Sequence, residues 1–325
     1  MKLDGTGQGP YRAGMRRSSI TLPALAAALL ALSACAGSAA GKQPWPAPRP
    51  AEPKAFLWEI TKPGAAGQPL YLTGSIHAGQ PGQFTFPPAF EGVIARAEAL
   101  VVEVDPAAAA SPGMQQAMMA QGLYAPPDRL SAHLDPKTLA LLPEGLARVG
   151  LKPEAVERLR PWMLAITLSV LELQKAGYDP AGGIDALLVE RFRGRELVPL
   201  ETPEAQLAML AGLPDRVQSL MVREAIEGSG TAAVALAQIA AAWQGGNPEG
   251  LASALFERAD DPELAPMYEA VFHARNRAMS ERLAPLVGGP KLHLAVVGAG
   301  HVVGPKGLLA LLEAKGFRVR QVERE

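Results

Sequence analysis

The sequence predicts an α/β fold of mixed α+β character, in which the two ends of the chain build a central sheet around a large helical insertion. Apolar runs typical of strands lie near both ends, within residues 56–104 and 292–322, whereas residues 111–285 are mainly of helical character. Two of these runs end alike, in a glycine followed three residues later by His77 or His301. Because ligands bind at the carboxyl ends of strands in open α/β sheets, we expect both histidines to face one crevice.

The first 34 residues are predicted to be a bacterial lipoprotein signal peptide. Arg16-Arg17 supplies a short basic region, and the apolar stretch Ile20–Leu32 is too short to span a bilayer comfortably. That stretch runs into Leu32-Ser33-Ala34-Cys35, a lipobox-like pattern in which the cysteine thiol takes the lipid. Cys35 is the single cysteine of the sequence, so an internal disulfide is excluded. An ordinary secretory signal is the alternative interpretation, and Met15 is an alternative start.

A tether and one folded domain are expected after the signal. Residues 35–53 are rich in Ala, Gly and Pro and are predicted to form a flexible tether, which leaves residues 54–325 as the folded part. Ala36, rather than Asp, follows Cys35, which by resemblance to enterobacterial lipoproteins favours the outer membrane. We therefore expect a lipid-anchored protein of the bacterial cell envelope that faces the periplasm, with the membrane as a partner.

Composition narrows the class of partner. The formal net charge of the full sequence is −1, and removal of residues 1–34 would leave a mature form with about −4. No basic block or interleaving of basic and aromatic residues occurs, so nucleic acid is not an expected partner.

The N-terminal part of the sheet follows from three apolar runs. Phe56–Ile60 and Pro69–Thr73 flank a turn segment rich in Pro and Gly, and they predict a β-hairpin that leads directly to the first histidine. Pro88–Ala99 predicts a helix with proline in its first turn. The continuous apolar run Ala99–Val104 predicts a buried strand, with Glu103 near its carboxyl end.

The middle and the C-terminal part follow from prolines, caps and a final βα unit. Glu196–Leu200 predicts a short strand that ends at Glu201, and Thr202 predicts the N-cap of the next helix. Four prolines are expected to start or end helices of the insertion: Pro136, Pro143, Pro153 and Pro161. The chain then closes with a strand, a helix and an alternating edge strand: Leu292–Val297, Pro305–Lys315 and Phe317–Val322.

Polar residues at these strand ends form the candidate site. His77, Glu103 and His301 make a plausible set of three metal ligands with an open position for water. The glycine before each histidine is expected to let the backbone turn sharply. Glu201, or Asp105 near Glu103, could act as general base or orient a histidine. This spacing is much less specific than a His-Glu-x-x-His motif.

Each candidate also has a structural interpretation. Glu103 could be a buried acid paired with an arginine, Glu201 a helix N-terminal acid and Asp105 a turn residue. For Arg275 and its neighbour Arg277, a solvated helix face is favoured over contact with a carboxylate. The remaining histidines of the folded part are interpreted as structural: His133, His273 and His293. The alternation along its strand is compatible with a solvent-facing His293.

Several short motifs occur in a set order along residues 56–322: Leu57-Trp58-Glu59-Ile60, Leu72-Thr73-Gly74-Ser75-Ile76-His77, Val102-Glu103-Val104-Asp105, Gly183-Ile184-Asp185, Leu200-Glu201-Thr202 with Gln206, Arg275-Asn276 with Met279, and Val297-Gly298-Ala299-Gly300-His301. In this order the chain resembles the TraB/GumN family, which is related to the Tiki proteins of animals. Each motif alone is weak, whereas their order with a Gly-x-x-His at each end is specific.

The resemblance implies a fold shared with erythromycin-esterase-like and ChaN-like proteins. Tiki proteins resemble metal-dependent proteases supported by manganese or cobalt, and zinc is a further divalent candidate here. Carried over to this chain, the resemblance implies a metal and catalytic set of His77, Glu103 and His301, with Arg275 as a polar partner. The acidic residue usual before Arg-Asn is Ala274 in this sequence, which leaves an ion-pair role for Arg275 unsupported.

Three functions are consistent with these observations. The first is a lipid-anchored metal-dependent hydrolase, a peptidase in particular, acting on a peptide or protein substrate. The second is a non-catalytic lipoprotein that binds a peptide, a metal or haem in the same crevice. The third is a scaffold that meets a partner protein through the helical insertion, for instance at Met114–Met119, although core packing is the commoner use of such residues.

Overall fold

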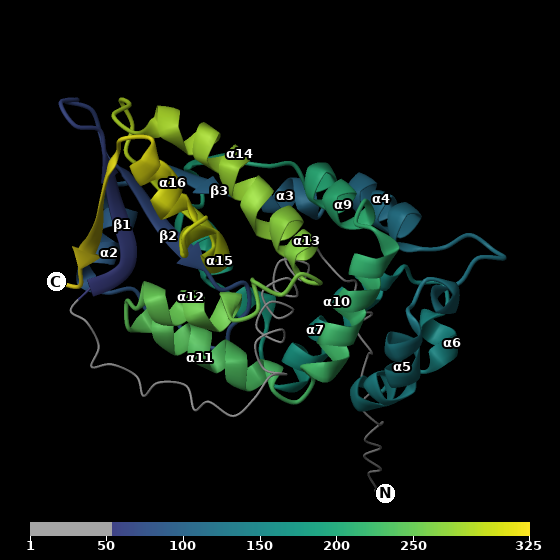
Figure 1. Ribbon diagram of the computed structural model, residues 1–325. Helices are drawn as coiled ribbons and strands as arrows, with labels where there is room; N and C mark the ends of the chain where they lie inside the picture. Colours follow the sequence, from purple (N-terminus) through teal and green to yellow (C-terminus); the bar gives the residue numbers. More distant parts are fainter. Residues whose placement is uncertain (1–53) are drawn as a thin grey trace, which may run out of the picture.

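The computed structural model describes residues 54–325 (Figure 1). The predicted signal peptide, the lipidation site Cys35 and the tether of residues 35–53 lie outside these described residues. The signal, the lipid and the tether therefore stay predictions.

A six-stranded mixed sheet confirms the α/β class. Its strand order is β4-β3-β5-β2-β1-β6, and the bounds are β1 Lys54–Thr61, β2 Leu70–Ser75, β3 Ala99–Val102, β4 Glu196–Pro199, β5 His293–Gly298 and β6 Arg318–Glu323. The predicted hairpin of β1 and β2 is antiparallel, and β6 is an edge strand on β1. One edge strand, β4, comes from the middle of the chain, so the sheet is not built from the two ends alone.

Four neighbouring strands run in the same direction and end at one edge of the sheet. β5 pairs in parallel with β2 on one side and with β3 on the other, and β3 pairs in parallel with β4. In register, Ser75 at the end of β2 lies opposite Gly298 at the end of β5. The carboxyl ends of β2, β5, β3 and β4 are therefore adjacent, as the crevice prediction requires.

The helices follow the predicted caps closely, with one exception. Thr202 Oγ accepts a hydrogen bond from the N–H of Ala205, as expected of an N-cap. Pro143 neither starts nor ends a helix but lies inside α5, a correction of the prediction. The helical bounds are α2 Pro88–Arg96, α3 Pro106–Ala109, α4 Pro112–Gly122, α5 Pro136–Val149, α6 Pro153–Val156, α7 Pro161–Lys175, α8 Ile184–Arg191, α9 Pro203–Ala211, α10 Asp215–Glu227, α11 Ala232–Gln244, α12 Pro248–Phe256, α13 Ala265–Tyr268, α14 Ala274–Leu283, α15 Ala299–Val302 and α16 Leu308–Ala314, with single turns η1 Leu130–Ala132, η2 Pro180–Gly182, η3 Glu269–His273 and η4 Ala284–Leu286.

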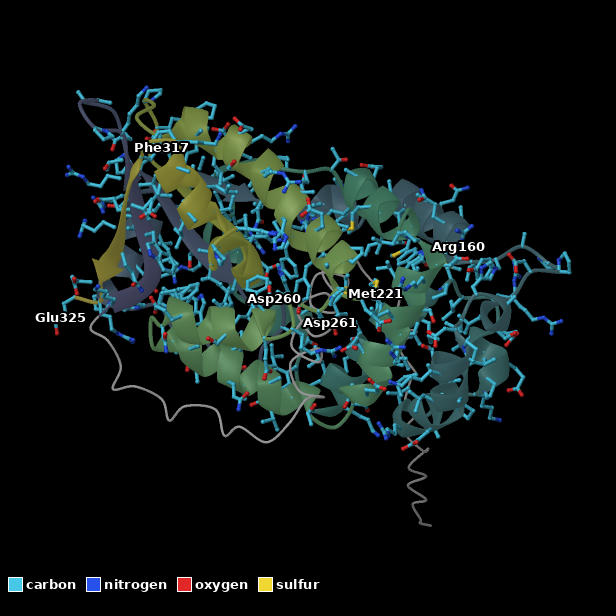
Figure 2. All side chains as sticks on the ribbon, viewed as in Figure 1. Arg160, Met221, Asp260, Asp261, Phe317 and Glu325 are labelled. Carbon is cyan, nitrogen blue, oxygen red and sulfur yellow. The ribbon has the colours of Figure 1, made fainter. Side chains whose placement is uncertain are left out.

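The buried apolar side chains form two hydrophobic clusters. One surrounds the sheet and includes residues of α2, α8, α11, α12, α14 and α16, with α11 and α12 drawn below the strands and α14 and α16 above them in Figure 1. The other joins α4, α5, α7, α9, α10 and α13. Figure 2 shows Met221, a fully buried residue of this second cluster, near the middle of the molecule, and Phe317, which packs on the first cluster, at the upper left.

No single helix within residues 54–325 is long and apolar enough to cross a membrane, and only the pair α10 and α11, bent by 91°, meets both criteria together.

Glycines at the strand ends allow close packing rather than sharp turns. Neither Gly74 nor Gly298 has a positive φ, which corrects the expected role of these glycines. A Cβ on Gly74 would lie 2.7 Å from Phe56 Cε1 and 2.8 Å from Ala299 Cα. The missing side chain therefore lets α15 lie directly against β2, and so brings the two histidine-bearing segments together.

We predict that Gly74→Ala destabilises the protein by about 1–3 kcal/mol, because the new methyl group would overlap a backbone atom that cannot move away. The matched control is Gly92→Ala in α2, where a Cβ would meet nothing within 4 Å. That change is expected to stabilise the helix by about 0.5–1 kcal/mol. Urea unfolding of both variants measures the difference, and equal effects would contradict the packing argument.

Candidate functional site

The structure brings five predicted site residues into one cluster at the carboxyl edge of the sheet. His77 follows β2, Glu103 follows β3, Glu201 follows β4 and His301 lies in α15 directly after β5. Arg275 reaches the same place from α14. The Nε2 atoms of His77 and His301 each lie 3.9 Å from the same oxygen, Glu103 Oε1.

His301 is held by an amide. Its Nδ1 lies 2.5 Å from Asn276 Oδ1, while the amide nitrogen of Asn276 donates to the carbonyl of Lys306. Because an amide oxygen only accepts, Nδ1 carries the proton and Nε2 presents its lone pair toward Glu103. Burial, followed by the charge of Arg275, lowers the pKa of His301 to about 3. The ring is therefore neutral at ordinary pH.

His77 is held by a carboxylate. Its Nδ1 lies 3.2 Å from Asp185 Oδ1, and Ser75 Oγ donates to that same oxygen at 2.6 Å. The backbone N–H of Asp185 donates back to Ser75 Oγ, which fixes the start of α8 against the end of β2. Burial works to lower the pKa of His77, but the charge and hydrogen bond of Asp185 outweigh it, so this pKa is raised.

Glu103 is bound on both of its oxygens. Oε1 accepts a short hydrogen bond from the backbone N–H of Gly298, and Oε2 accepts from Arg275 Nη2 at 2.6 Å. Gln206 Nε2 adds a longer contact to Oε2 at 3.4 Å. Burial alone would raise the pKa of Glu103, but the two histidines, Arg275 and the Gly298 N–H outweigh it and hold this pKa well below its usual range.

Arg275 is the centre of a buried ion-pair network, which corrects the solvated-face interpretation. The residue is 9% exposed, and its Nε and Nη2 bind both carboxylate oxygens of Glu201 at 2.7–3.0 Å. The interpretation of Glu201 as only a helix N-terminal acid is also wrong. Arg277 does lie on a solvated helix face, since it is exposed and pairs with Glu269 on the surface.

A π turn ends two residues before Arg275. Residues Glu269–His273 form η3, in which the N–H of Ala274 bonds to the carbonyl of Glu269, five residues back. Such turns shift the helix phase and are frequent at functional sites. Arg275 Nη1 also donates to the carbonyl of Val271 within this turn, at 3.1 Å. The π turn therefore both aims the guanidinium at the site and supplies one of its acceptors.

The other predicted polar residues lie outside this cluster. Asp105 is the N-cap of α3, where its carboxylate accepts from the N–H of Ala107. His133 bridges Asp128 and Asp215 in the helical part. His273 lies in η3, and His293 is buried at the start of β5, so the expectation that it could face solvent is wrong.

Four residues that contact the site belong to the sequence motifs, but the sequence predicted no role for them: Ser75, Asp185, Gln206 and Asn276. Each acts through a partner that is far away in the chain, such as Asn276 on His301. The pairing of two histidines with two short polar residues depends on tertiary structure, so spacing alone could not identify it.

A small cavity opens beside the cluster. Its volume is about 70 Å³, and its polar lining comprises His77, Glu103, Asp185 and Gln206. Gly298 borders the same place, since a Cβ there would lie 3.0 Å from His77 Nε2 and 3.1 Å from Glu103 Oε1. The absent side chain thus leaves free the space between the histidine and the carboxylate.

The donor types of the cluster suit a divalent cation, although their spacing is wide. Metal-bound histidines almost always donate their other ring N–H to a carboxylate or a carbonyl, as His77 and His301 do here. Two ligands of a tetrahedral zinc ion lie about 3.4 Å apart, whereas each Nε2 lies 3.9 Å from Glu103 Oε1. Within residues 54–325 no group of three or more His, Cys, Asp and Glu side chains is arranged to hold a metal. The three-ligand set stays a prediction.

Comparison with known protein families identifies the family of this chain. The TraB/PrgY/gumN family matches residues 56–321, nearly all of the described chain. No protein of curated function and no solved structure matches the sequence.

We predict that Arg275→Met lowers the free energy of unfolding by about 3–5 kcal/mol, because it leaves two buried carboxylates without their cation. Adding Glu201→Gln to this variant should restore part of the loss. The matched control, Arg277→Met, removes an exposed ion pair and should cost no more than about 0.5–1 kcal/mol. Chemical unfolding tests this, and equal losses in the two single variants would contradict the network.

We predict that Gly298→Ala disturbs the site while the backbone stays unstrained, because residue 298 has a φ of −49°. The added methyl group should displace the ring of His77. Imidazole NMR shifts of His77 should change, and those of distant His133 should not. Unchanged His77 signals would show that the space between the groups is not needed.

Proposed function

This chain belongs to the TraB/PrgY/gumN family, and from that premise we propose that it is a metal-dependent hydrolase, specifically a peptidase. One observation carries the proposal: two histidines, each with Nδ1 engaged by an acceptor, direct Nε2 at one carboxylate oxygen. His77, His301 and Glu103 would hold the cation.

The charges of the cluster support a dication. Glu103, Glu201 and Asp185 contribute three formal negative charges, and Arg275 contributes one positive charge. With His301 neutral, the cluster carries an excess of two negative charges when His77 is neutral and of one when His77 is protonated, and such an excess in a buried place is costly unless it is compensated. A divalent cation would offset that excess, polarise a substrate carbonyl and lower the pKa of water.

The chain's own groups would divide the remaining work. Gly298 and Arg275 keep Glu103 ionised and fixed in place, and Glu201 positions Arg275. Both oxygens of Glu201 bind this guanidinium, which makes Glu201 a poor proton acceptor. Asp185 uses Oδ1 for Ser75 and His77, while within the described residues its Oδ2 accepts no hydrogen bond. We assign Asp185 as the group that takes the proton from the attacking water.

The alternative function is a non-catalytic protein that binds a peptide, a metal or haem, and of these ligands haem has the least support. A cavity of about 70 Å³ is well below the 300–1,000 Å³ of pockets for drug-sized ligands. A peptide or a lone metal remains compatible with a role without turnover, and the absence of hydrolysis by the metal-loaded protein would favour it.

We also propose that the fold is of the erythromycin-esterase-like and ChaN-like type, supported by the two Gly-x-x-His segments on adjacent parallel strands. The proposed setting is the periplasmic face of the outer membrane, with a lipid on Cys35. Support for that setting comes from the lipobox-like sequence.

We predict that purified full-length protein, loaded with manganese, cobalt or zinc, retains about one metal per chain. The His77→Ala/His301→Ala double variant should lose this metal, because each substitution removes a ring nitrogen. His133→Ala, which removes an imidazole from the helical part, should retain it. Elemental analysis after desalting measures the content, and an equally loaded double variant, or no retained metal at all, would refute the proposed set.

A further inference from the structure

The cavity beside the cluster has one apolar side that the proposed chemistry does not use. Its lining there is aliphatic throughout and comes from β3 and the residues after it, from α3, α8 and β5: Val102, Val104, Pro106, Ala109, Val189 and Val296. None of these side chains carries a polar atom. The rest of the lining comprises His77, Glu103, Asp185 and Gln206, so a group that fills the cavity lies next to these polar side chains.

We infer that this side of the cavity is a specificity pocket for a short aliphatic side chain, such as that of alanine or valine, next to the bond that is cleaved. The inference rests on the proposed function, which it refines by naming the substrate class. A buried aliphatic group gains from contact with such a wall, whereas a charged or strongly polar group would lose its hydration without gaining a partner.

The size of the cavity sets the limit. The volume of about 70 Å³ is well below the roughly 300–1,000 Å³ of pockets for drug-sized ligands, which favours a small side chain over an aromatic ring. Two of the walls cannot yield easily. Val102 and Val296 are buried strand residues that lie opposite each other in the parallel β3–β5 ladder.

Val189 is the wall residue that can tune this limit. It lies four residues after Asp185 on α8, so both side chains project from the same face of the helix. Substitution of Val189 therefore changes the volume of the pocket while it leaves the carboxylate in place.

Gln206 supplies an acceptor for the peptide backbone. Its Nε2 donates to Glu201 and Glu103, which orients the amide, and its Oε1 accepts no hydrogen bond within residues 54–325. Because Gln206 also lines the cavity, a substrate N–H can bind there while the neighbouring aliphatic side chain occupies the apolar side.

The test uses full-length protein and peptides Gly-Gly-X-Gly-Gly in which X is alanine, valine, leucine or phenylalanine. Ligand-observed NMR gives the dissociation constant of each peptide, and turnover is measured separately with manganese, cobalt or zinc. The wild type should prefer alanine or valine over phenylalanine by at least tenfold. Val189→Ala should improve leucine about tenfold relative to alanine, and Val189→Phe should abolish binding of all four peptides.

The matched controls are Val234→Ala and Val234→Phe, because Val234 lies on α11 with 59% of its surface exposed. Neither should change binding or turnover, and circular dichroism verifies that every variant is folded. Turnover without a size preference, or a preference that Val189 does not alter, would overturn the pocket and leave the hydrolase proposal intact. Size-selective binding without turnover would support the pocket and overturn hydrolysis. Neither binding nor turnover would overturn both.

Discussion

Arg275 lies buried between Glu103 and Glu201, and this ion-pair network links the ends of β3 and β4 to α14. Burying three charged groups is favourable only if each is paired and hydrogen-bonded. The network meets that condition, because the Gly298 N–H donates to the other oxygen of Glu103 and the Val271 carbonyl accepts from the third guanidinium nitrogen. Segments from four parts of the chain are thereby held at one place.

Backbone packing supplies the second constraint on the site. The histidine segments meet because Gly74 lets α15 approach β2 within contact distance, and the space between His77 and Glu103 stays free because residue 298 has no side chain. A π turn sets the direction of Arg275. The chemistry of the site therefore depends on absent side chains and one irregular helical turn as much as on the polar groups themselves.

Some polar atoms of the cluster have hydrogen-bond partners in the protein, and others remain open to a ligand. Both oxygens of Glu103 and Glu201 are engaged, and the Nδ1 atoms of both histidines are fixed by acceptors. Within residues 54–325, no hydrogen bond reaches the two histidine Nε2 atoms, Asp185 Oδ2 or Gln206 Oε1. This division favours a catalytic or ligand-binding role over a purely structural ion-pair network, because three of the residues that carry these open positions line one cavity: His77, Asp185 and Gln206.

The sequence by itself determined the strands and the polar residues that follow them, because apolar runs and the polar residues at their ends are local features. These polar residues include His77, Glu103, Glu201 and His301. It also supported the family. Tertiary structure alone decided the partners, since Arg275 and Glu103 are 172 residues apart. On its own helix, Arg275 has the polar neighbours of a solvated face, and only the fold brings two carboxylates to it. The role of the glycines likewise depended on which backbone packs against them, which no local pattern encodes.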